Sequence, residues 1–244
     1  MKTMATRFVM AGLALAYASQ ASAQAAGAPK VERSVFLDLN AAFQASPRSV
    51  ETSSTFPLFG ETGAAATRQQ PGTSVLADAR LGYRVSAQFG VAVGFAGGRS
   101  ETLGKTSASV PSAIRFASPS LVTLDAPGLK RREAGCHIQA VWFLPLSGSG
   151  DTTVALSGGP SLIRLQQGVP RVAVDAAGQA SINVANETGT AKGVHAGVDL
   201  ARAFSDRLGV GVFVRYVAAS VDLPSAAGVK VGGVQAGGGL RIRF

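Results

Sequence analysis

The chain has 244 residues, of which 15% are charged, and a net charge of +9. Its single cysteine, Cys136, excludes an internal disulfide, and beyond the amino-terminal region no apolar stretch is long enough to span a membrane as a helix. The basic residues are scattered rather than gathered into a stripe, which argues against a nucleic-acid partner and favours attraction to anionic headgroups.

The first 23 residues have the parts of a secretory signal peptide. Lys2 and Arg7 give a positive start, residues 8–17 form a short apolar run, and the small residues 21–23 predict cleavage before Gln24. Cleavage leaves 221 residues, and the loss of the two basic side chains lowers the net charge to +7. Residues 24–33 are then expected to form a short periplasmic lead.

Alternation with a period of two begins just after this lead. Every second residue from Val35 to Phe43 is apolar, whereas Asp38, Asn40 and Gln44 fall on the opposite face. Seven later segments repeat the design, with Val93, Val198 and Val212 among the residues assigned to the apolar face. These segments predict strands over residues 74–85, 89–96, 130–144, 152–166, 191–203, 207–218 and 229–244. Within the segment that starts at 152, Gly158-Gly159-Pro160 predicts a bulge or an early break, because proline cannot join a central ladder.

The connections between these segments alternate in length. Short ones lie near residues 86–87, 145–151 and 204–206, and long ones cover 45–73, 97–129, 167–190 and 219–228. A strand can cross lipid only in a closed sheet, because no water satisfies a free edge there. The sequence therefore predicts an all-β fold: one antiparallel up-and-down transmembrane barrel of about eight strands over residues 34–244, with long outer loops and short periplasmic turns.

The last strand ends on an aromatic residue. Leu240, Ile242 and Phe244 alternate with polar positions, and Gly239 lies five residues before the end. This pattern resembles the assembly signal of bacterial outer-membrane β-barrel proteins, in which the final Phe is read by the barrel-assembly machinery. That family prefers a polar residue at the position of Gly237.

The segments 81–85, 158–161 and 237–244 make the chain similar to the bacterial outer-membrane β-barrel domain family, and broadly to the transmembrane domain of outer membrane protein A. The resemblance implies residence in the outer membrane, contact with its lipids and lipopolysaccharide, and no cofactor. Members of the family include structural anchors, adhesins and small channels, so the fold by itself indicates little about function.

The polar faces of the strands predict a charged lumen. A barrel of about eight strands has an interior just wide enough for its own side chains, so its charges are expected to pair into a plug. A narrow ion path is the alternative. The inward set is Asp38, Asp78, Arg80, Arg84, Arg131, Glu133, His137, His195, Asp199, Arg215, Arg241 and Arg243.

No catalytic, cofactor or metal site is predicted. Barrels of the lipid A deacylase type carry a serine two residues after their histidine, whereas His137 is followed at that spacing by Gln139 and His195 by Gly197. Two histidines and one cysteine far apart give no zinc spacing, and no glycine-rich run has the context of a phosphate-binding loop.

Two features of the long connections could contact other molecules. Residues 56–59 form an apolar patch that is expected to fold back over the barrel mouth, with a surface-contact or lipid-adhesion role as the alternative. The basic residues 130–132 could reach toward headgroups. The predicted role is non-enzymatic, structural or surface-interacting, with no nucleic-acid partner and an unidentified extracellular ligand. A small solute or ion channel is the alternative, and a soluble periplasmic ligand-binding barrel, which needs a polar exterior, is a weaker one.

Overall fold

The computed structural model describes residues 34–244 except 46–48, 71, 147–150 and 176–178. The predicted signal peptide and the lead at 24–33 lie outside the described residues. No helix in the described part of the chain is long and apolar enough to cross a bilayer. The strands are β1 (Ser34–Ala45), β2 (Val50–Leu58), β3 (Glu61–Gln69), β4 (Ser74–Arg84), β5 (Phe89–Val110), β6 (Ser120–Pro145), β7 (Thr152–Val174), β8 (Ala180–Ala203), β9 (Leu208–Leu223) and β10 (Ala226–Arg243).

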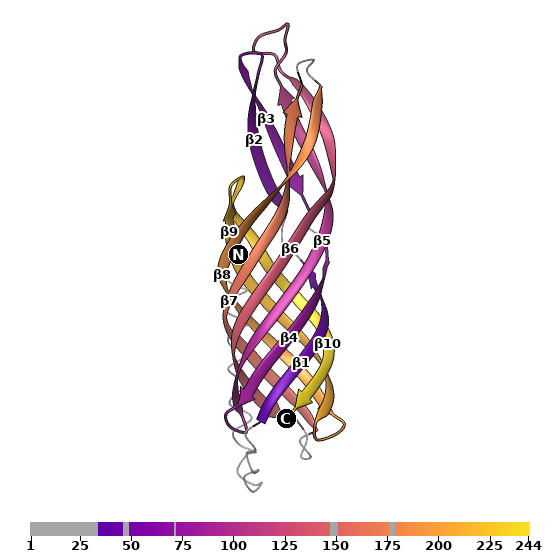
Figure 1. The fold of residues 1–244 in the computed structure, drawn as a ribbon, viewed down its shortest axis with the longest axis vertical. Coiled ribbons are helices and arrows are strands. Elements are labelled where there is room, and N and C mark those ends of the chain that lie inside the picture. The colour runs from indigo at the N-terminus through magenta and orange to yellow at the C-terminus, as the bar shows by residue number, and fades with distance from the viewer. Residues whose placement is uncertain (1–33, 46–48, 71, 147–150, 176–178) are drawn as a thin grey trace, which may run out of the picture. The chain divides into compact units, whose positions relative to one another are not determined.

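Eight of these strands close into an antiparallel ring. Each of β4 to β9 pairs with the next strand along the chain, and β1 lies between β4 and β10 (Figure 1). Closure leaves no free strand edge within the ring, so every backbone group there can be paired without water. The predicted eight-stranded up-and-down barrel is confirmed.

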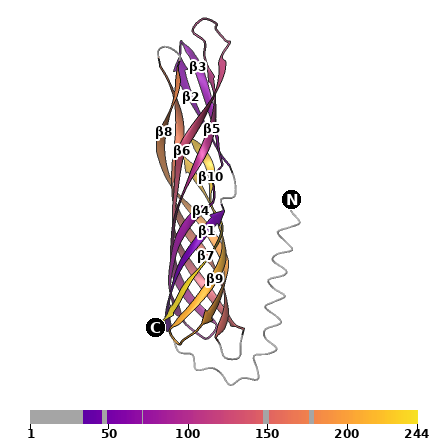
Figure 2. The ribbon, with the colours of Figure 1, turned by 90° about the vertical axis from the view of Figure 1, so that its right-hand side faces the viewer.

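Short turns join the strands at one end of the ring. The backbone N–H of Val85 donates to the carbonyl of Phe89 at 2.9 Å, and that of Phe204 donates to Leu208 at 3.1 Å. The carboxy-terminus lies at this same end (Figures 1 and 2). Short turns and the chain terminus mark the periplasmic end of a membrane barrel, as the sequence predicts.

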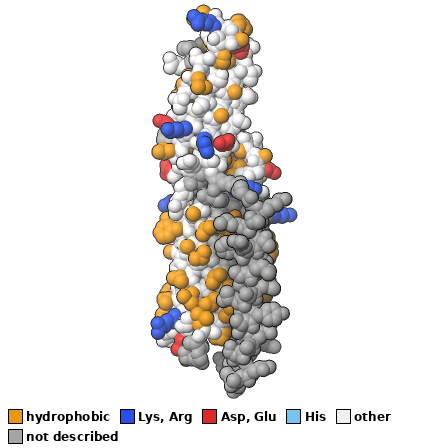
Figure 3. Space-filling model, turned by 180° about the vertical axis from the view of Figure 1, so that it is seen from behind, with side chains coloured by type: hydrophobic (Ala, Val, Ile, Leu, Met, Phe, Trp, Pro, Cys, Tyr) orange, Lys and Arg blue, Asp and Glu red, His pale blue; other side chains and the backbone are white. Residues whose placement is uncertain are grey.

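The outside of the ring is apolar. Val93, Val198 and Val212, which the alternation assigns to the outer face, are 39%, 47% and 58% exposed. Hydrophobic side chains gather on the lower half of the face seen in Figure 3 and are sparser on the upper half. An outer surface of this kind is stable against lipid and not against water. The polar exterior that a soluble ligand-binding barrel requires is absent from the described ring.

The long outer connections are built mostly of strand rather than of irregular chain. The ladder of β5 with β6 continues to Val110 and Ser120, and that of β7 with β8 continues to Val174 and Ala180. The first long connection contains the hairpin β2–β3, which pairs with the upper part of β5. Hydrogen bonds between backbone groups need no apolar face. They can therefore extend these strands above the apolar belt, which is the band of apolar side chains around the outside of the ring.

Above the ring the sheet divides into two ribbons. β6 and β7 pair only as far as Arg131 and Gln167. Beyond that level one ribbon contains β2, β3, β5 and β6, and the other contains β7 and β8; we call the two together the upper extension. Its ribbons share an apolar core of Ala65, Ala108, Val110 and Val172, against which Phe56 and Leu58 pack.

The predicted break at Gly158-Gly159-Pro160 is wrong. β7 runs without interruption, and its register with β6 is the same on both sides of the motif, with Ala140 opposite Gly158 and His137 opposite Ser161. No residue is inserted, so no bulge forms. Gly159 and Pro160 pair with β8 but have no ladder partner on β6, because proline has no N–H to donate.

Candidate functional site

The lumen holds a neutral cluster of four charged side chains near its periplasmic end. Arg80 donates from Nε to Oδ2 of Asp38 at 2.6 Å, and Arg241 donates from Nη2 to Oδ2 of Asp199 at 2.6 Å. Cross pairs at 3.6 and 3.7 Å join the two ion pairs into a square. The four residues come from β1, β4, β8 and β10 and are buried, so each carboxylate is compensated by two guanidinium groups.

The hydrogen bonds continue upward from this square. Arg241 donates to the side-chain oxygen of Asn40 at 2.6 Å, and Asn40 donates to Asp78 at 2.9 Å. Arg215 forms a further ion pair with Asp78 at 2.8 Å and also donates to Gln235 at 2.8 Å. Asp78 therefore has both oxygens occupied, one by an amide and one by a guanidinium.

A third layer extends the same chain of contacts. Gln235 donates to Gln44 at 2.6 Å, and Gln44 donates to Glu133 at 2.9 Å. Glu133 accepts from Nε of Arg131 at 2.8 Å, and Arg131 also donates to Gln167 at 3.3 Å. Polar side chains thus form one unbroken chain of hydrogen bonds from the periplasmic square to the level where the sheet divides.

Apolar side chains pack beside this polar column. Near the periplasmic end lie Phe36, Ala92, Val141, Phe143 and Ala155. A larger group surrounds the upper lumen and contains Val50, Ile163, Leu165, Ala191, Val217, Val221, Leu223, Val229 and Val231. The side chains of the barrel therefore occupy its own interior, which is the packing expected of an eight-stranded ring.

The two histidines meet at a serine that the sequence did not single out. Ser161 Oγ lies 2.9 Å from Nδ1 of His137 and 2.9 Å from Nδ1 of His195. The hydroxyl can donate to one ring and accept from the other. Ser161 directly follows the stretch predicted to break, and only the strand register, which places it opposite His137, reveals the contact.

A serine beside a histidine is also the arrangement of a nucleophilic enzyme. Here Ser161, His137 and His195 are all buried inside the lumen, and neither ring is hydrogen-bonded to a carboxylate in the described structure. A lipid acyl chain on the outer surface cannot reach the hydroxyl. No group of three or more metal-binding side chains occurs among the described residues.

The terminal strand completes the ring. β10 pairs with β1 from Phe36 opposite Arg243 upward, and the N–H of Phe244 donates to the carbonyl of Val35 at 2.9 Å. The side chains of Leu240 and Phe244 are exposed on the outer face, Ile242 is half-buried, and Gly239 lies opposite Asn40.

The two features of the long connections lie in different surroundings. The patch 56–59 ends β2 and turns into β3; Phe56 and Leu58 pack into the core of the upper extension, so the patch does not fold back over the mouth as expected. In the basic stretch 130–132, Arg131 points into the lumen, whereas Lys130 and Arg132 are exposed.

No protein-family model matches the chain, and no curated protein matches it. Among solved structures, the chain is similar to the outer membrane protein OprG of Pseudomonas aeruginosa, with 10% identity over 88% of this chain and 97% of that one and a TM-score of 0.49. It is also similar to Neisserial surface protein A, with 14% identity over 86% of this chain and 97% of that one and a TM-score of 0.44. The attachment invasion locus protein Ail of Yersinia pestis is similar as well, with 11% identity over 86% of this chain and 99% of that one and a TM-score of 0.40.

The fold and its surfaces decide the class of protein. The ring is closed, the outward faces of its strands are apolar in a belt just above the short turns, and its interior is polar and internally paired. Lipid requires this combination, and alternation of apolar-out and polar-in residues along every strand is the property of outer-membrane barrels. The chain has the fold of the β-barrels of bacterial outer membranes.

Proposed function

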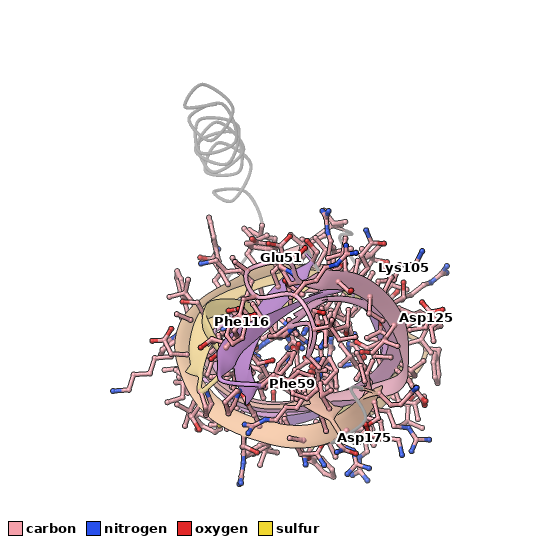
Figure 4. All side chains as sticks on the ribbon, turned by 90° about the horizontal axis from the view of Figure 1, so that it is seen from above. Glu51, Phe59, Lys105, Phe116, Asp125 and Asp175 are labelled. Carbon is pink, nitrogen blue, oxygen red and sulfur yellow. The ribbon has the colours of Figure 1, made fainter. Side chains whose placement is uncertain are left out.

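We propose that this protein is a non-enzymatic barrel whose upper extension contacts a surface facing the cell. The observation that supports this function is a group of exposed apolar side chains at the outermost turns, which we call the tip surface. Phe59 is 39% exposed, Ile114 92%, Phe116 81% and Leu121 78%. Figure 4 looks down on this end, with Phe59 and Phe116 labelled.

The tip surface joins two separate turns. The backbone N–H of Ala117 donates to Oε1 of Glu61 at 2.7 Å, which ties the β5–β6 turn to the β2–β3 hairpin. Arg115, also exposed, lies between Ile114 and Phe116 in the sequence. Apolar side chains around a cation on a protruding turn suit the interface of a lipid bilayer with anionic headgroups. The packed core of the extension gives the tip a firm support.

Removal of the two most exposed apolar groups tests this function. For the barrel in nanodiscs, we expect Ile114→Ser with Phe116→Ser to weaken binding to phosphatidylcholine vesicles that contain phosphatidylglycerol by about tenfold or more, because burial of each side chain contributes about 1.5–3 kcal/mol. Vesicle co-flotation measures the binding.

The matched control is Leu103→Ser, since Leu103 is 75% exposed but lies on β5 below the tip. It should leave vesicle binding unchanged. Equal binding by the double variant and the unmodified barrel, or an equal loss in the control, would contradict the proposed contact.

Lipopolysaccharide is the lipid partner that the outer face favours. On the outward face of four consecutive strands, β5 to β8, the first charged residue above the apolar side chains is basic and exposed. These residues are Arg99, Arg132, Arg164 and Lys192. The strand registers place Arg99 opposite Arg132. Arg164 is offset from Arg132 by two residues along the strand, and Lys192 is offset from Arg164 by the same amount. A basic row at the border of the apolar belt can pair with the phosphate groups of a lipid.

The terminal strand is the proposed contact for the barrel-assembly machinery. We expect deletion of Phe244 to reduce the amount of inserted protein several-fold and to leave chain in the periplasm, because the deletion removes the terminal aromatic side chain and the hydrogen bond to Val35. Phe244→Ala, which keeps that bond, should be milder. Outer-membrane fractionation with immunoblotting measures the effect.

Phe204→Ala is the matched control, since Phe204 is another exposed aromatic at the same end of the ring. Normal outer-membrane levels of the truncated chain would refute the role of Gly239, Leu240, Ile242 and Phe244 as an assembly signal.

A further inference from the structure

Two arginines at the periplasmic mouth of the lumen have no carboxylate partner in the described structure. Arg84 ends β4 and Arg243 ends β10, and the two strands flank β1, where Ser34 pairs with Arg84 and Phe36 with Arg243. Both side chains line one recess, together with Ser34 and Thr153. The recess is partly open to solvent.

The charges around this recess do not balance. Its two carboxylates, Asp38 and Asp199, each already lie between Arg80 and Arg241 in the neutral square. The guanidinium groups of Arg84 and Arg243 are therefore two positive charges in excess, and they are close enough to repel each other. An isolated pair of like charges in a half-buried site lowers stability unless an anion joins it.

The recess also holds one guanidinium in place. The guanidinium carbon of Arg84 lies 4.1 Å from the centre of the Phe143 ring. A cation over an aromatic face is stabilised by the ring while its N–H groups stay free to donate in the plane of the guanidinium. The aromatic rings of Phe36 and Phe143, packed edge to face, close the inner side of the site.

We propose that this recess binds a small oxyanion from the periplasm, either inorganic phosphate or a phosphate monoester. Two forked guanidinium groups match the tetrahedral oxygens of a phosphate, and the hydroxyls of Ser34 and Thr153 add donors of the right kind at the wall. Binding neutralises the excess charge at the mouth and so stabilises the lower end of the barrel. This site is independent of the contact proposed for the tip surface.

Thermal unfolding of the refolded barrel in zwitterionic detergent tests the site. We expect inorganic phosphate, titrated at constant ionic strength against chloride, to raise the Tm saturably by a few degrees, because a ligand that binds only the folded state stabilises it. Isothermal titration should show that Arg84→Gln with Arg243→Gln weakens phosphate binding by about tenfold or more. Without phosphate, that double variant should be at least as stable as the unmodified protein, because it removes the repulsion.

The matched control is Arg202→Gln with Arg207→Gln, which removes the same charge from exposed positions at the same end of the barrel but outside the recess. It should keep the phosphate effect. A phosphate effect that persists in the Arg84 and Arg243 variant, that disappears equally in the control, or that never saturates would overturn the proposal. The titration is repeated in vesicles with and without phosphatidylglycerol. If free phosphate loses its effect only where phosphatidylglycerol is present, lipid headgroups fill the site and a soluble anion does not.

Discussion

An arginine in place of Val212 is expected to lower the free energy of unfolding by about 2–4 kcal/mol, which is the cost of that charge near the bilayer midplane. Val212 lies halfway along the apolar outer face of β9 and is 58% exposed, so the substituted side chain has no protein cavity to enter. Urea unfolding of the barrel in phosphatidylcholine vesicles measures the loss. Val93→Arg and Val198→Arg should behave alike.

The control for this prediction lies on the same strand and the same face. Ser220 is exposed on β9, eight residues above Val212 and beyond the apolar belt, so Ser220→Arg should cost about 0–1 kcal/mol. In a Cys136→Ser background, a cysteine at 212 should react with a lipid-soluble probe and poorly with a water-soluble one. Equal costs at the two positions, or the reverse labelling, would show that the apolar face does not meet lipid.

The membrane-spanning part of the fold was predictable because lipid imposes a simple pattern. Each strand of the ring must present apolar residues on one face and can bury polar ones on the other. Spacing alone therefore predicts that Val93 faces outward and that Arg80 faces the lumen. The same constraint accounts for the strand count and for the short turns, since the pattern stops abruptly at residues 86–87 and 204–206.

The upper extension gave no such pattern. Residues 104–110 are mostly small or hydroxyl-bearing, and nothing in their spacing separates a strand from a loop. They form strands because the ladder of β5 and β6 simply continues, and because Ala108 and Val110 pack against the second ribbon. Both causes are long-range contacts, which a local reading of the chain does not contain.

The polar column shows a similar limit inside the lumen. Burial of Asp78, Arg131 and Arg215 follows from their position on the inward faces, but their partners depend on which strands become neighbours and at what register. Gln235 and Gln44 link the two halves of the column. The alternation places Gln44 on the inward face, but neither glutamine belongs to the predicted charged set, although a buried ion pair requires such groups to satisfy its remaining hydrogen bonds.

Glu133→Ala is expected to lower the free energy of unfolding by about 3–5 kcal/mol, or less if water enters the vacated space. The substitution leaves the buried guanidinium of Arg131 without its carboxylate, and it also removes the acceptor for Gln44 and for the backbone N–H of Gly232. The urea midpoint in vesicles measures the loss. Glu51→Ala is the matched control, because the Glu51–Arg68 pair is exposed and should contribute about 0–1 kcal/mol.

The same pair of variants separates a plug from a channel. We propose that the charged column closes the lumen, so planar-bilayer recordings should show conductance near zero for the unmodified barrel and for the Glu51 variant. Glu133→Ala should lose stability without acquiring steady currents, because Leu165, which lies opposite Glu133, and Val217 belong to an apolar cluster that still packs in the lumen at this level. A channel would instead conduct before any substitution, and loss of the Glu133 carboxylate would change its ion selectivity, since charges that line a pore set selectivity. Steady open-channel currents from the unmodified protein would therefore refute the plug and favour a transport function.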